Sequence, residues 1–172
     1  ERFKHQYPNS PYTKYIEPLV AEVVAYQQNS LNGFRAEVHI IDNDTINSFA
    51  ALLKPFRGKK VFVDVWASWC SSCLDDFSES KDRYERLKQQ SVEMLYISTD
   101  NDNREQQWIA TVKHYGLKGY HIRVNGLLNA DLKRILNLSD GWVLPQYFLV
   151  DSDGSVLLVD NSPEPLANYL KI

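Results

Sequence analysis

The sequence predicts an α/β sandwich whose sheet is mostly parallel, with an antiparallel edge. Two patterns carry this prediction. Short apolar runs typical of buried strands alternate with amphipathic segments of helical period, and the chain closes with a strand, a turn, a second strand and a short helix. The length of 172 residues suits one domain with a full core plus some elaboration. Hydrophobic residues make up 44% of the chain, which excludes an intrinsically disordered protein.

Charge and hydropathy exclude several kinds of partner. The net charge is −3 and the lysines and arginines are scattered, so we expect neither nucleic acid nor an anionic membrane surface to bind. No apolar stretch approaches the roughly 20 residues that a bilayer span needs. The sequence starts at Glu1 rather than Met, which we interpret as a mature form or an excised domain. The lack of a signal peptide then says nothing about the compartment.

Residues 1–35 predict a helical extension, or the end of an upstream domain. Ser10-Pro11 offers a helix start after an aperiodic lead-in, and Asn32-Gly33 offers a stop. Because Pro18 lies inside the amphipathic stripe between them, we expect a kink or two short helices. We interpret the stripe as a packing surface, for the main domain or for a missing upstream one, rather than as a helix that fills a partner's groove. Its apolar members are Tyr12, Tyr15, Ile16, Leu19, Val20, Val23 and Val24.

The main domain, residues 36–172, alternates strand and helix patterns. Asp42 or Asp44 is the expected cap of a helix at 45–53, and Gly116 is the expected end of a helix at 104–115. An acidic first half and a basic second half favour a helix at 74–89, because this order suits the helix dipole. The remaining helices are expected at 127–138 and 164–170, and the strands at 36–41, 61–66, 92–98, 120–124, 146–150 and 155–159, the last two joined by a hairpin turn.

The chemistry centres on Cys70 and Cys73, which are the only cysteines and lie just after the apolar run 61–66. A Cys-x-x-Cys pair at the start of a helix places its first thiol over unpaired backbone N–H groups, at the positive end of the helix dipole. The thiolate is stabilised there, and the pKa of the thiol falls below its free value of about 8.5. We therefore interpret Cys70 as the nucleophile that attacks a partner disulfide. Cys73 is the more buried thiol that resolves the mixed disulfide.

Other uses of the pair are less favoured. A structural disulfide between such close residues closes too small a loop to add much stability. A zinc site needs four ligands, and His5, His39, His114 and His121 lack the spacing. A c-type haem site needs a histidine directly after the second cysteine, where Leu74 stands. We expect no metal and no cofactor.

The stretch Val63–Cys73, with the sequence VDVWASWCSSC, resembles the active-site motif of the thioredoxin superfamily. The resemblance covers about residues 36–172. An added helix–strand segment and the later stretch Leu144–Gly154 (LPQYFLVDSDG) are similar to the TlpA/ResA-like thiol–disulfide oxidoreductases, which are extracytoplasmic bacterial proteins, soluble or membrane-tethered. This resemblance implies a thioredoxin-like three-layer α/β/α sandwich with a mixed central sheet.

The resemblance also implies roles for Asp64 and for Leu144-Pro145. Asp64 matches the buried acid six residues before the first cysteine. In an apolar strand its pKa would be raised, and it would carry the proton that Cys73 loses. Pro145 matches a cis-proline, which would place the Leu144 backbone beside Cys70, ready to pair with an extended substrate segment. The alternatives are a carboxylate merely hydrogen-bonded at a strand end, and an ordinary trans proline that enters a strand.

Two tryptophans are candidates for an apolar docking patch that binds substrate. Trp69 directly precedes Cys70, and Trp142 stands just before Leu144. For Trp142, docking and plain packing are equally open. Trp66 is expected in the core.

Four positions depart from the family pattern. Ser71-Ser72 lacks both the proline common in reductants and the histidine common in strong oxidants, which favours a moderately reducing couple. Ser78 stands where many relatives have a helix-kinking proline, so we expect this helix to run straighter. Asp76 falls where ResA-like proteins carry a glutamate near the thiols. It would tune the pKa of the thiols, unless it is simply an exposed carboxylate in the first turn of a helix.

Together these features predict a dithiol oxidoreductase that reduces or exchanges disulfides in proteins of the bacterial periplasm or cell envelope. Its electrons would come from a membrane or envelope donor. Two alternatives stay open. A thiol peroxidase would need an activating Thr and Arg near the cysteine, and Trp66–Cys70 offers neither. A non-enzymatic thioredoxin-like interaction module of a larger protein would use residues 1–35 as its attachment.

Overall fold

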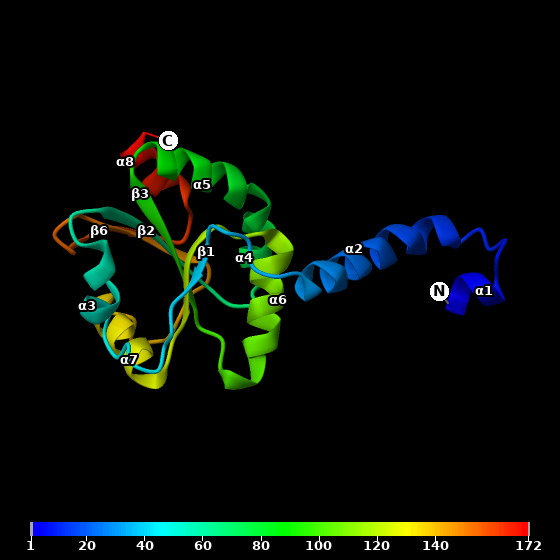
Figure 1. Ribbon diagram of the computed structural model, residues 1–172, viewed down its shortest axis with the longest axis horizontal. Coiled ribbons are helices and arrows are strands. Elements are labelled where there is room, and N and C mark those ends of the chain that lie inside the picture. Colours follow the sequence, from blue (N-terminus) through cyan, green and yellow to red (C-terminus); the bar gives the residue numbers. More distant parts are fainter. Residues whose placement is uncertain (1, 172) are drawn as a thin grey trace.

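One mixed six-stranded sheet forms the centre of the protein. The structure is a computed structural model that describes residues 2–171, and Figure 1 shows its arrangement. The strands are β1 (Val38–Ile40), β2 (Lys60–Trp66), β3 (Val92–Ser98), β4 (Gly119–Arg123), β5 (Gln146–Val150) and β6 (Val156–Asp160). They lie in the order β1-β4-β3-β2-β5-β6. The first four pair in parallel, whereas β5 pairs antiparallel with both β2 and β6. The expected mostly parallel sheet with an antiparallel edge is confirmed.

Helices cover both faces of this sheet, which confirms the three-layer sandwich. The α-helices are α1 (Arg2–Gln6), α2 (Thr13–Leu31), α3 (Phe49–Leu52), α4 (Ser71–Asp76), α5 (Ser80–Gln89), α6 (Glu105–Tyr115), α7 (Gly126–Ile135) and α8 (Glu164–Leu170). Short 3₁₀ segments are η1 (Lys54–Phe56), η2 (Phe77–Glu79) and η3 (Asp102–Arg104). Strands β3 and β5 and helix α8 have the bounds that the sequence predicts.

Strand β2 separates two cores, because alternate side chains of a strand point to opposite faces of a sheet. One face packs under α4, α5, α6 and α8, and the other packs under α3 and α7. Each fully buried apolar side chain contributes about 1.5–3 kcal/mol to this packing. Phe62, Asp64 and Trp66 belong to the first face and Val61, Val63 and Val65 to the second, all at most 1% exposed.

The helix expected at 74–89 is not straight, so that prediction is wrong. It begins earlier, at Ser71, and is divided into α4 and α5 by the 3₁₀ turn η2. The Phe77 ring is 2% exposed and packs edge-on against Trp66, with ring centroids 5.0 Å apart. The Ser80 hydroxyl donates a hydrogen bond to the Phe77 carbonyl oxygen at 2.7 Å. Packing and a local hydrogen bond therefore produce the interruption without a proline at position 78.

Two other helices also differ from the prediction. Helix α3 is much shorter than 45–53, and its N-cap is Ser48, whose Oγ accepts from the Ala51 N–H at 3.2 Å, rather than Asp42 or Asp44. Helix α2 runs through Pro18 as one element instead of breaking. Lys14, whose carbonyl loses its helical partner to the proline, is an exposed residue, so water can hydrate that oxygen.

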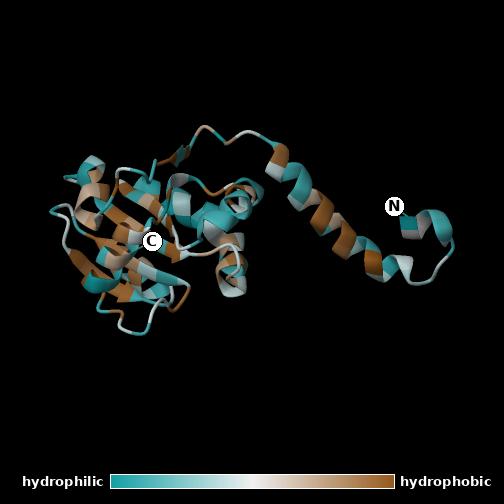
Figure 2. Cartoon of the chain, turned by 90° about the horizontal axis from the view of Figure 1, so that it is seen from below, coloured by the Kyte–Doolittle hydropathy of each residue, from teal (hydrophilic) through white to brown (hydrophobic). Residues whose placement is uncertain are grey.

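Helix α2 projects from the domain, and only its C-terminal part is joined to α6 (Figures 1 and 2). Tyr26 shares a hydrogen bond with Thr111, Oη to Oγ1, at 3.3 Å, and Lys113 Nζ donates to the Ser30 carbonyl oxygen at 3.1 Å. The apolar stripe at 12–24 stays 36–66% exposed, so of its two expected packing partners the main domain is excluded, and packing on an upstream domain stays a prediction. Within residues 2–171, none of the helices combines the length and apolar character needed to cross a bilayer.

Gly119→Ala is expected to lower the free energy of unfolding by about 2–4 kcal/mol. Gly119 has a φ of +129°, and a Cβ there would lie 2.6 Å from the Met94 carbonyl oxygen, which belongs to the sheet backbone. Urea denaturation measures the loss. The matched control is Gly126→Ala at the start of α7, where a Cβ meets nothing within 4 Å and alanine favours the helix. Equal losses in the two variants would contradict this account.

Candidate active site

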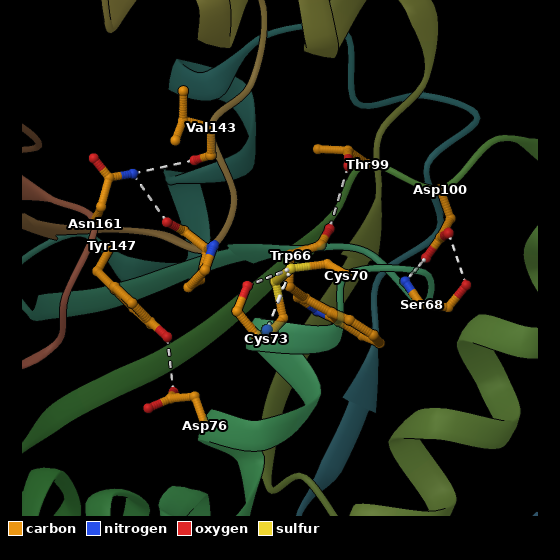
Figure 3. The surroundings of a disulfide bond; sticks show 12 residues. Trp66, Ser68, Cys70, Cys73, Asp76, Thr99, Asp100, Val143, Tyr147 and Asn161 are labelled. Carbon is orange, nitrogen blue, oxygen red and sulfur yellow. Dashed lines mark hydrogen bonds between the residues drawn. A yellow bond between two sulfur atoms is a disulfide. The ribbon is translucent and has the colours of Figure 1, made fainter.

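The two cysteines lie where β2 ends and α4 begins (Figure 3). The carbonyl oxygen of Trp66, the last residue of β2, accepts hydrogen bonds from Thr99 N at 2.9 Å and Thr99 Oγ1 at 3.3 Å. Because Thr99 directly follows β3, these bonds extend the contact between the two strands beyond their ends. The Cys70 N–H then donates to the Ala67 carbonyl oxygen at 3.0 Å, which closes the turn. The loop that carries Cys70 is therefore fixed to the centre of the sheet.

Asp100, in the loop that follows β3, holds the loop that carries Cys70. It is 1% exposed, and its carboxylate accepts three hydrogen bonds, each at 2.8 Å: from Ser68 N, Ser68 Oγ and Ser98 Oγ. Hydrogen bonds to an ionised acceptor are roughly twice as strong as neutral ones. Asp100 thus stabilises the turn two residues before Cys70, a role the sequence prediction did not include.

Cys70 and Cys73 form a disulfide bond, with an S–S distance of 2.07 Å. Cys70 is the N-cap of α4, and its Sγ accepts a hydrogen bond from the Cys73 N–H at 3.2 Å. The Ser72 hydroxyl lies 3.5 Å from the same sulfur. Cys73 is the more buried of the two, at 1% exposed against 6% for Cys70. The first sulfur therefore sits on the positive end of the helix, as the spacing predicts.

The Leu144–Pro145 peptide bond is cis, as the resemblance implies. Leu144 is half-buried and packs against both cores, one of which contains the two cysteines. Asn161 Nδ2 donates to the Val143 carbonyl oxygen at 3.2 Å and to the Pro145 carbonyl oxygen at 3.0 Å (Figure 3). Asn161 therefore ties down the carbonyl groups on either side of Leu144 and leaves the Leu144 carbonyl to other partners.

Asp64 lies on the disulfide side of the sheet and is 0% exposed. In the sheet register it is the neighbour of Tyr96 on β3 and of Tyr147 on β5. Both of its carboxyl oxygens are buried and have no hydrogen-bond partner among the described residues. Burial raises the pKa of Asp64 to about 8, while the positive charge of Arg83 lowers it and the negative charge of Asp76 raises it. The alternative of a carboxylate hydrogen-bonded at a strand end does not describe this environment.

Asp76 is not the exposed carboxylate of the alternative interpretation, since its side chain is 19% exposed and both of its oxygens are engaged. Oδ1 accepts from Arg83 Nη2 at 2.8 Å, and Oδ2 accepts from the Tyr147 hydroxyl at 2.7 Å (Figure 3 shows the latter). The pKa of Tyr147 is raised, by burial first and then by the charge of Asp64, so this hydroxyl keeps its proton and acts as the donor. Asp76 thereby joins α4 to α5 and β5.

The three tryptophans near the cysteines have different surroundings. Trp69 is 58% exposed, and Trp66 is fully buried as expected. Trp142 is half-buried against the core under α3 and α7, and its Nε1–H donates to Asn129 Oδ1 at 2.8 Å. This contact favours packing over docking for Trp142.

The sequence prediction missed Arg83, Tyr147, Asp100 and Asn161. Of these, only Asp100 had a usable signal, because it follows the end of an apolar strand parallel to β2, where side chains gather at one edge of a sheet. In the sequence, Arg83 cannot be distinguished from the other basic residues in the second half of the helix expected at 74–89. Asn161 lies in a polar loop after β6, and only the folded chain brings it to Val143 and Pro145.

A family described as "Thioredoxin-like" matches residues 58–156, more than half of the chain. The chain belongs to this family. The matched segment contains both cysteines, Asp64 and the cis-proline.

The curated relatives of this chain include ResA proteins. Thiol-disulfide oxidoreductase ResA of Bacillus cereus is 31% identical over 122 residues, which cover 69% of this chain and 66% of that protein. ResA of Bacillus subtilis is 29% identical over 107 residues, covering 62% of this chain and 55% of that protein. This chain thus matches 55–66% of the length of these relatives, which is less than two thirds.

Two solved structures are similar to this chain in fold. A thiol-disulfide oxidoreductase from Bacteroides fragilis has a TM-score of 0.56 at 25% identity, covering 69% of this chain and 83% of that one. The thioredoxin domain of a Bacteroides vulgatus thiol-disulfide oxidoreductase has a TM-score of 0.57 at 24% identity, covering 69% of this chain and 81% of that one. These likenesses do not extend over the whole of this chain.

Asp100→Ala is expected to lower the free energy of unfolding by about 2–4 kcal/mol, because Ser68 N and two hydroxyls lose their shared charged acceptor in a buried place. Urea denaturation measures this loss. Hydrogen exchange should also become faster at the Ser68 amide. The control is Asp102→Ala, whose side chain is 95% exposed and whose partner Arg123 has a second carboxylate, that of Glu105, at 4.0 Å, so that it should cost less than Asp100→Ala. If the two variants lose the same amount, Asp100 does not hold the loop.

Between about pH 4 and pH 8 the stability of the oxidised protein, relative to that of its Asp64→Asn variant, is expected to fall as pH rises. The ordinary pKa of 3.8 applies to Asp64 in the unfolded chain, and burial raises it to about 8 in the folded one. The folded protein therefore holds a proton that the unfolded chain releases. The contribution of this proton to stability is complete below the unfolded-state pKa of 3.8, and it is lost as pH rises toward the folded-state pKa of about 8.

The excess slope is expected to approach about 1.4 kcal/mol per pH unit in the middle of this window. Urea denaturation of both proteins at about pH 5 and about pH 7.5 measures it, because all other titrating groups are common to the two. Parallel pH dependences would show that Asp64 titrates normally in the folded protein.

Proposed function

We propose that this protein is a thiol–disulfide oxidoreductase that exchanges electrons with disulfides of other proteins through Cys70 and Cys73. The observation that carries the proposal is the cysteine pair at the N-terminus of α4, where Cys70 Sγ accepts a hydrogen bond from the Cys73 N–H. A buried acid, Asp64, lies on the same side of the sheet. Membership of the thioredoxin-like family and the similarity to ResA proteins support it.

In the reducing direction, the Cys70 thiolate attacks one sulfur of a substrate disulfide. A mixed disulfide forms, and the other substrate sulfur leaves as a thiolate that takes a proton from water. Cys73 then gives its proton to the Asp64 carboxylate and attacks the Cys70 sulfur. The Cys70–Cys73 bond forms, the mixed disulfide breaks and the second substrate sulfur leaves. Two electrons have passed from the dithiol to the substrate, and the same steps in reverse oxidise a substrate dithiol.

Asp64 suits the role of proton carrier because both of its forms are accessible near neutral pH. With a pKa of about 8, roughly a tenth of the Asp64 side chains are ionised at pH 7. The protonated form donates when the Cys73 sulfur leaves as a thiolate, and the ionised form accepts in the opposite direction. Asp76 tunes this chemistry in our proposal, through its charge near Asp64.

The substrate segment docks on the surface beside Cys70. Trp69 is 58% exposed and directly precedes Cys70, and Val143 is 64% exposed and directly precedes Leu144, so both offer apolar surface for docking. The backbone of Leu144, in the cis-proline loop, pairs with an extended stretch of the substrate. Trp142 supports this loop through its packing.

The proposed place of action is outside the cytoplasm, in the bacterial periplasm or cell envelope, where substrate disulfides form and persist. The resemblance to TlpA/ResA-like proteins supports this location. The dithiol would be regenerated by a membrane or envelope electron donor. Residues 1–35, with the exposed stripe of α2, are proposed to be an appendage of the redox domain or the end of an upstream one.

Insulin reduction with dithiothreitol tests the function. Cys70→Ser and Cys73→Ser are each expected to lower the rate by at least about 100-fold, because the first lacks the nucleophile and the second cannot resolve the mixed disulfide. Mass spectrometry should find a covalent insulin adduct on Cys73→Ser and none on Cys70→Ser. Ser78→Ala, at an exposed serine in η2, is the matched control and should retain activity.

Two outcomes would overturn the proposal. Peroxide consumption without disulfide exchange would identify a thiol peroxidase. No thiol-dependent turnover of either kind, with no adduct on Cys73→Ser, would identify an interaction module in which the cysteines have no catalytic role.

A further inference from the structure

A row of ionisable side chains crosses the sheet on the disulfide side. The register places Tyr147, Asp64, Tyr96 and His121 next to one another on β5, β2, β3 and β4. Each is at most 1% exposed. The rings of Tyr96 and His121 stack in parallel, with centroids 4.7 Å apart and planes 6° from parallel. A continuous polar band therefore runs through an otherwise apolar core.

Most of this row is electrically neutral at physiological pH. Burial raises the pKa values of Tyr96 and Tyr147, so both keep their protons. Burial lowers the pKa of His121 to about 3, so its ring carries no charge. His121 Nε2 lies 3.0 Å from the Leu117 carbonyl oxygen. Neither the tyrosines nor the histidine can balance a charge on Asp64.

Arg83 brings a positive charge to this band from α5. Its residue is 5% exposed, and its guanidinium carbon lies 5.7 Å from the centre of the Tyr147 ring. Nη2 is used by Asp76 Oδ1, whereas Nη1 is buried with no hydrogen-bond partner among the described residues. The donors of Nη1 and the charge of Arg83 are therefore not used up by Asp76, and both Asp64 oxygens also lack a hydrogen-bond partner among the described residues.

The charges that face Asp64 from the packed elements are therefore few. Helix α4 brings Asp76, α5 brings Arg83, and the strands and the disulfide bring neutral groups. Asp76 opposes ionisation of Asp64, and Arg83 favours it. Because Asp76 also anchors Arg83 through a hydrogen bond, it fixes the position of the cation.

We propose that Arg83 is a positioning residue for the thiol chemistry: anchored on Asp76, its charge stabilises the carboxylate form of Asp64, which can then take the proton that Cys73 loses. The inference rests on the proposed function. Without Arg83, burial and Asp76 would keep Asp64 protonated over a wider pH range. Each unit by which the pKa of Asp64 rises lowers the share of carboxylate about tenfold at a given pH below that value.

Carbon-13 NMR titration of the Asp64 carboxyl in the oxidised protein tests the electrostatic part. In Arg83→Met the pKa of Asp64 is expected to rise by about one unit or more. Arg83→Gln removes the charge but can still donate to Asp76, and it should show the same rise if the methionine variant does not fold. In Arg83→Lys, which keeps the charge, the pKa of Asp64 should rise less than in Arg83→Gln. An Asp64 pKa that is the same in Arg83→Gln as in the unmodified protein would overturn the proposal.

Rates test the mechanistic part. Release of substrate from the mixed disulfide, measured by stopped flow at pH 7, should slow about tenfold in Arg83→Gln. The pH profile of this rate should move to higher pH by the same amount as the pKa of Asp64. In an Asp64→Asn background, Arg83→Gln should cause little further slowing, because Arg83 acts through Asp64. An equal slowing in both backgrounds would assign Arg83 a purely structural role and overturn the proposal.

These outcomes separate this inference from the proposed function. Failure of the Cys70 and Cys73 variants to change insulin reduction would remove the function, whatever the titration shows. A cysteine-dependent activity together with an unchanged Asp64 pKa would keep the function and reject the role of Arg83.

Discussion

The burial of one carboxyl group, that of Asp64, is the constraint on which the rest of the site depends. An ionised carboxylate in a dry core is costly, by several kcal/mol, unless a counter-charge or hydrogen bonds stabilise it. Strand β2 nevertheless places Asp64 between Phe62 and Trp66 on the face that packs under α4 and α5. The neighbouring groups therefore decide whether this acid holds a proton. In the oxidised protein its pKa of about 8 keeps it mostly protonated at neutral pH.

The bend between α4 and α5 determines which groups those neighbours are. Phe77 inserts its ring into the core, and the chain changes direction before α5 begins at Ser80. As a result Asp76 and Arg83, which lie on two different helices, meet at 2.8 Å and both reach Tyr147. In a straight helix, two residues that are seven positions apart lie about 10.5 Å from each other along the axis. The interruption between α4 and α5 therefore helps to bring Asp76 and Arg83 together.

Two polar side chains fix the loops on either side of the disulfide. Asp100 accepts hydrogen bonds from the turn before Cys70, and Asn161 donates to the carbonyl groups around Leu144. Both act on backbone or loop atoms and neither lies in the cysteine motif. The thiols are therefore held at the helix terminus by contacts from β3 and from the segment after β6. The exposed stripe of α2 plays no part in this arrangement.

The sequence by itself determined the sheet and the reactive pair. The alternation of apolar runs and helical periods predicted six strands and their mixed pairing, because these patterns depend only on which faces are buried. The spacing of Cys70 and Cys73 identified the reactive pair, and the resemblance to the thioredoxin motif pointed to Asp64 and to Leu144-Pro145. Local signals failed where packing overruled them, as at Phe77 and in the short α3.

Only the tertiary structure decided what surrounds the acid. Arg83, Tyr96 and Tyr147 come from α5, β3 and β5, and Tyr147 lies 71 residues from Asp76, its hydrogen-bond partner. No periodicity links residues so far apart, because their contact arises only when the strands pair and the helices pack over them. Burial, which raises the pKa of Asp64, is likewise a property of the whole fold. The chain sequence therefore names the thiols, and the packed core sets the charges that act on the acid beneath them.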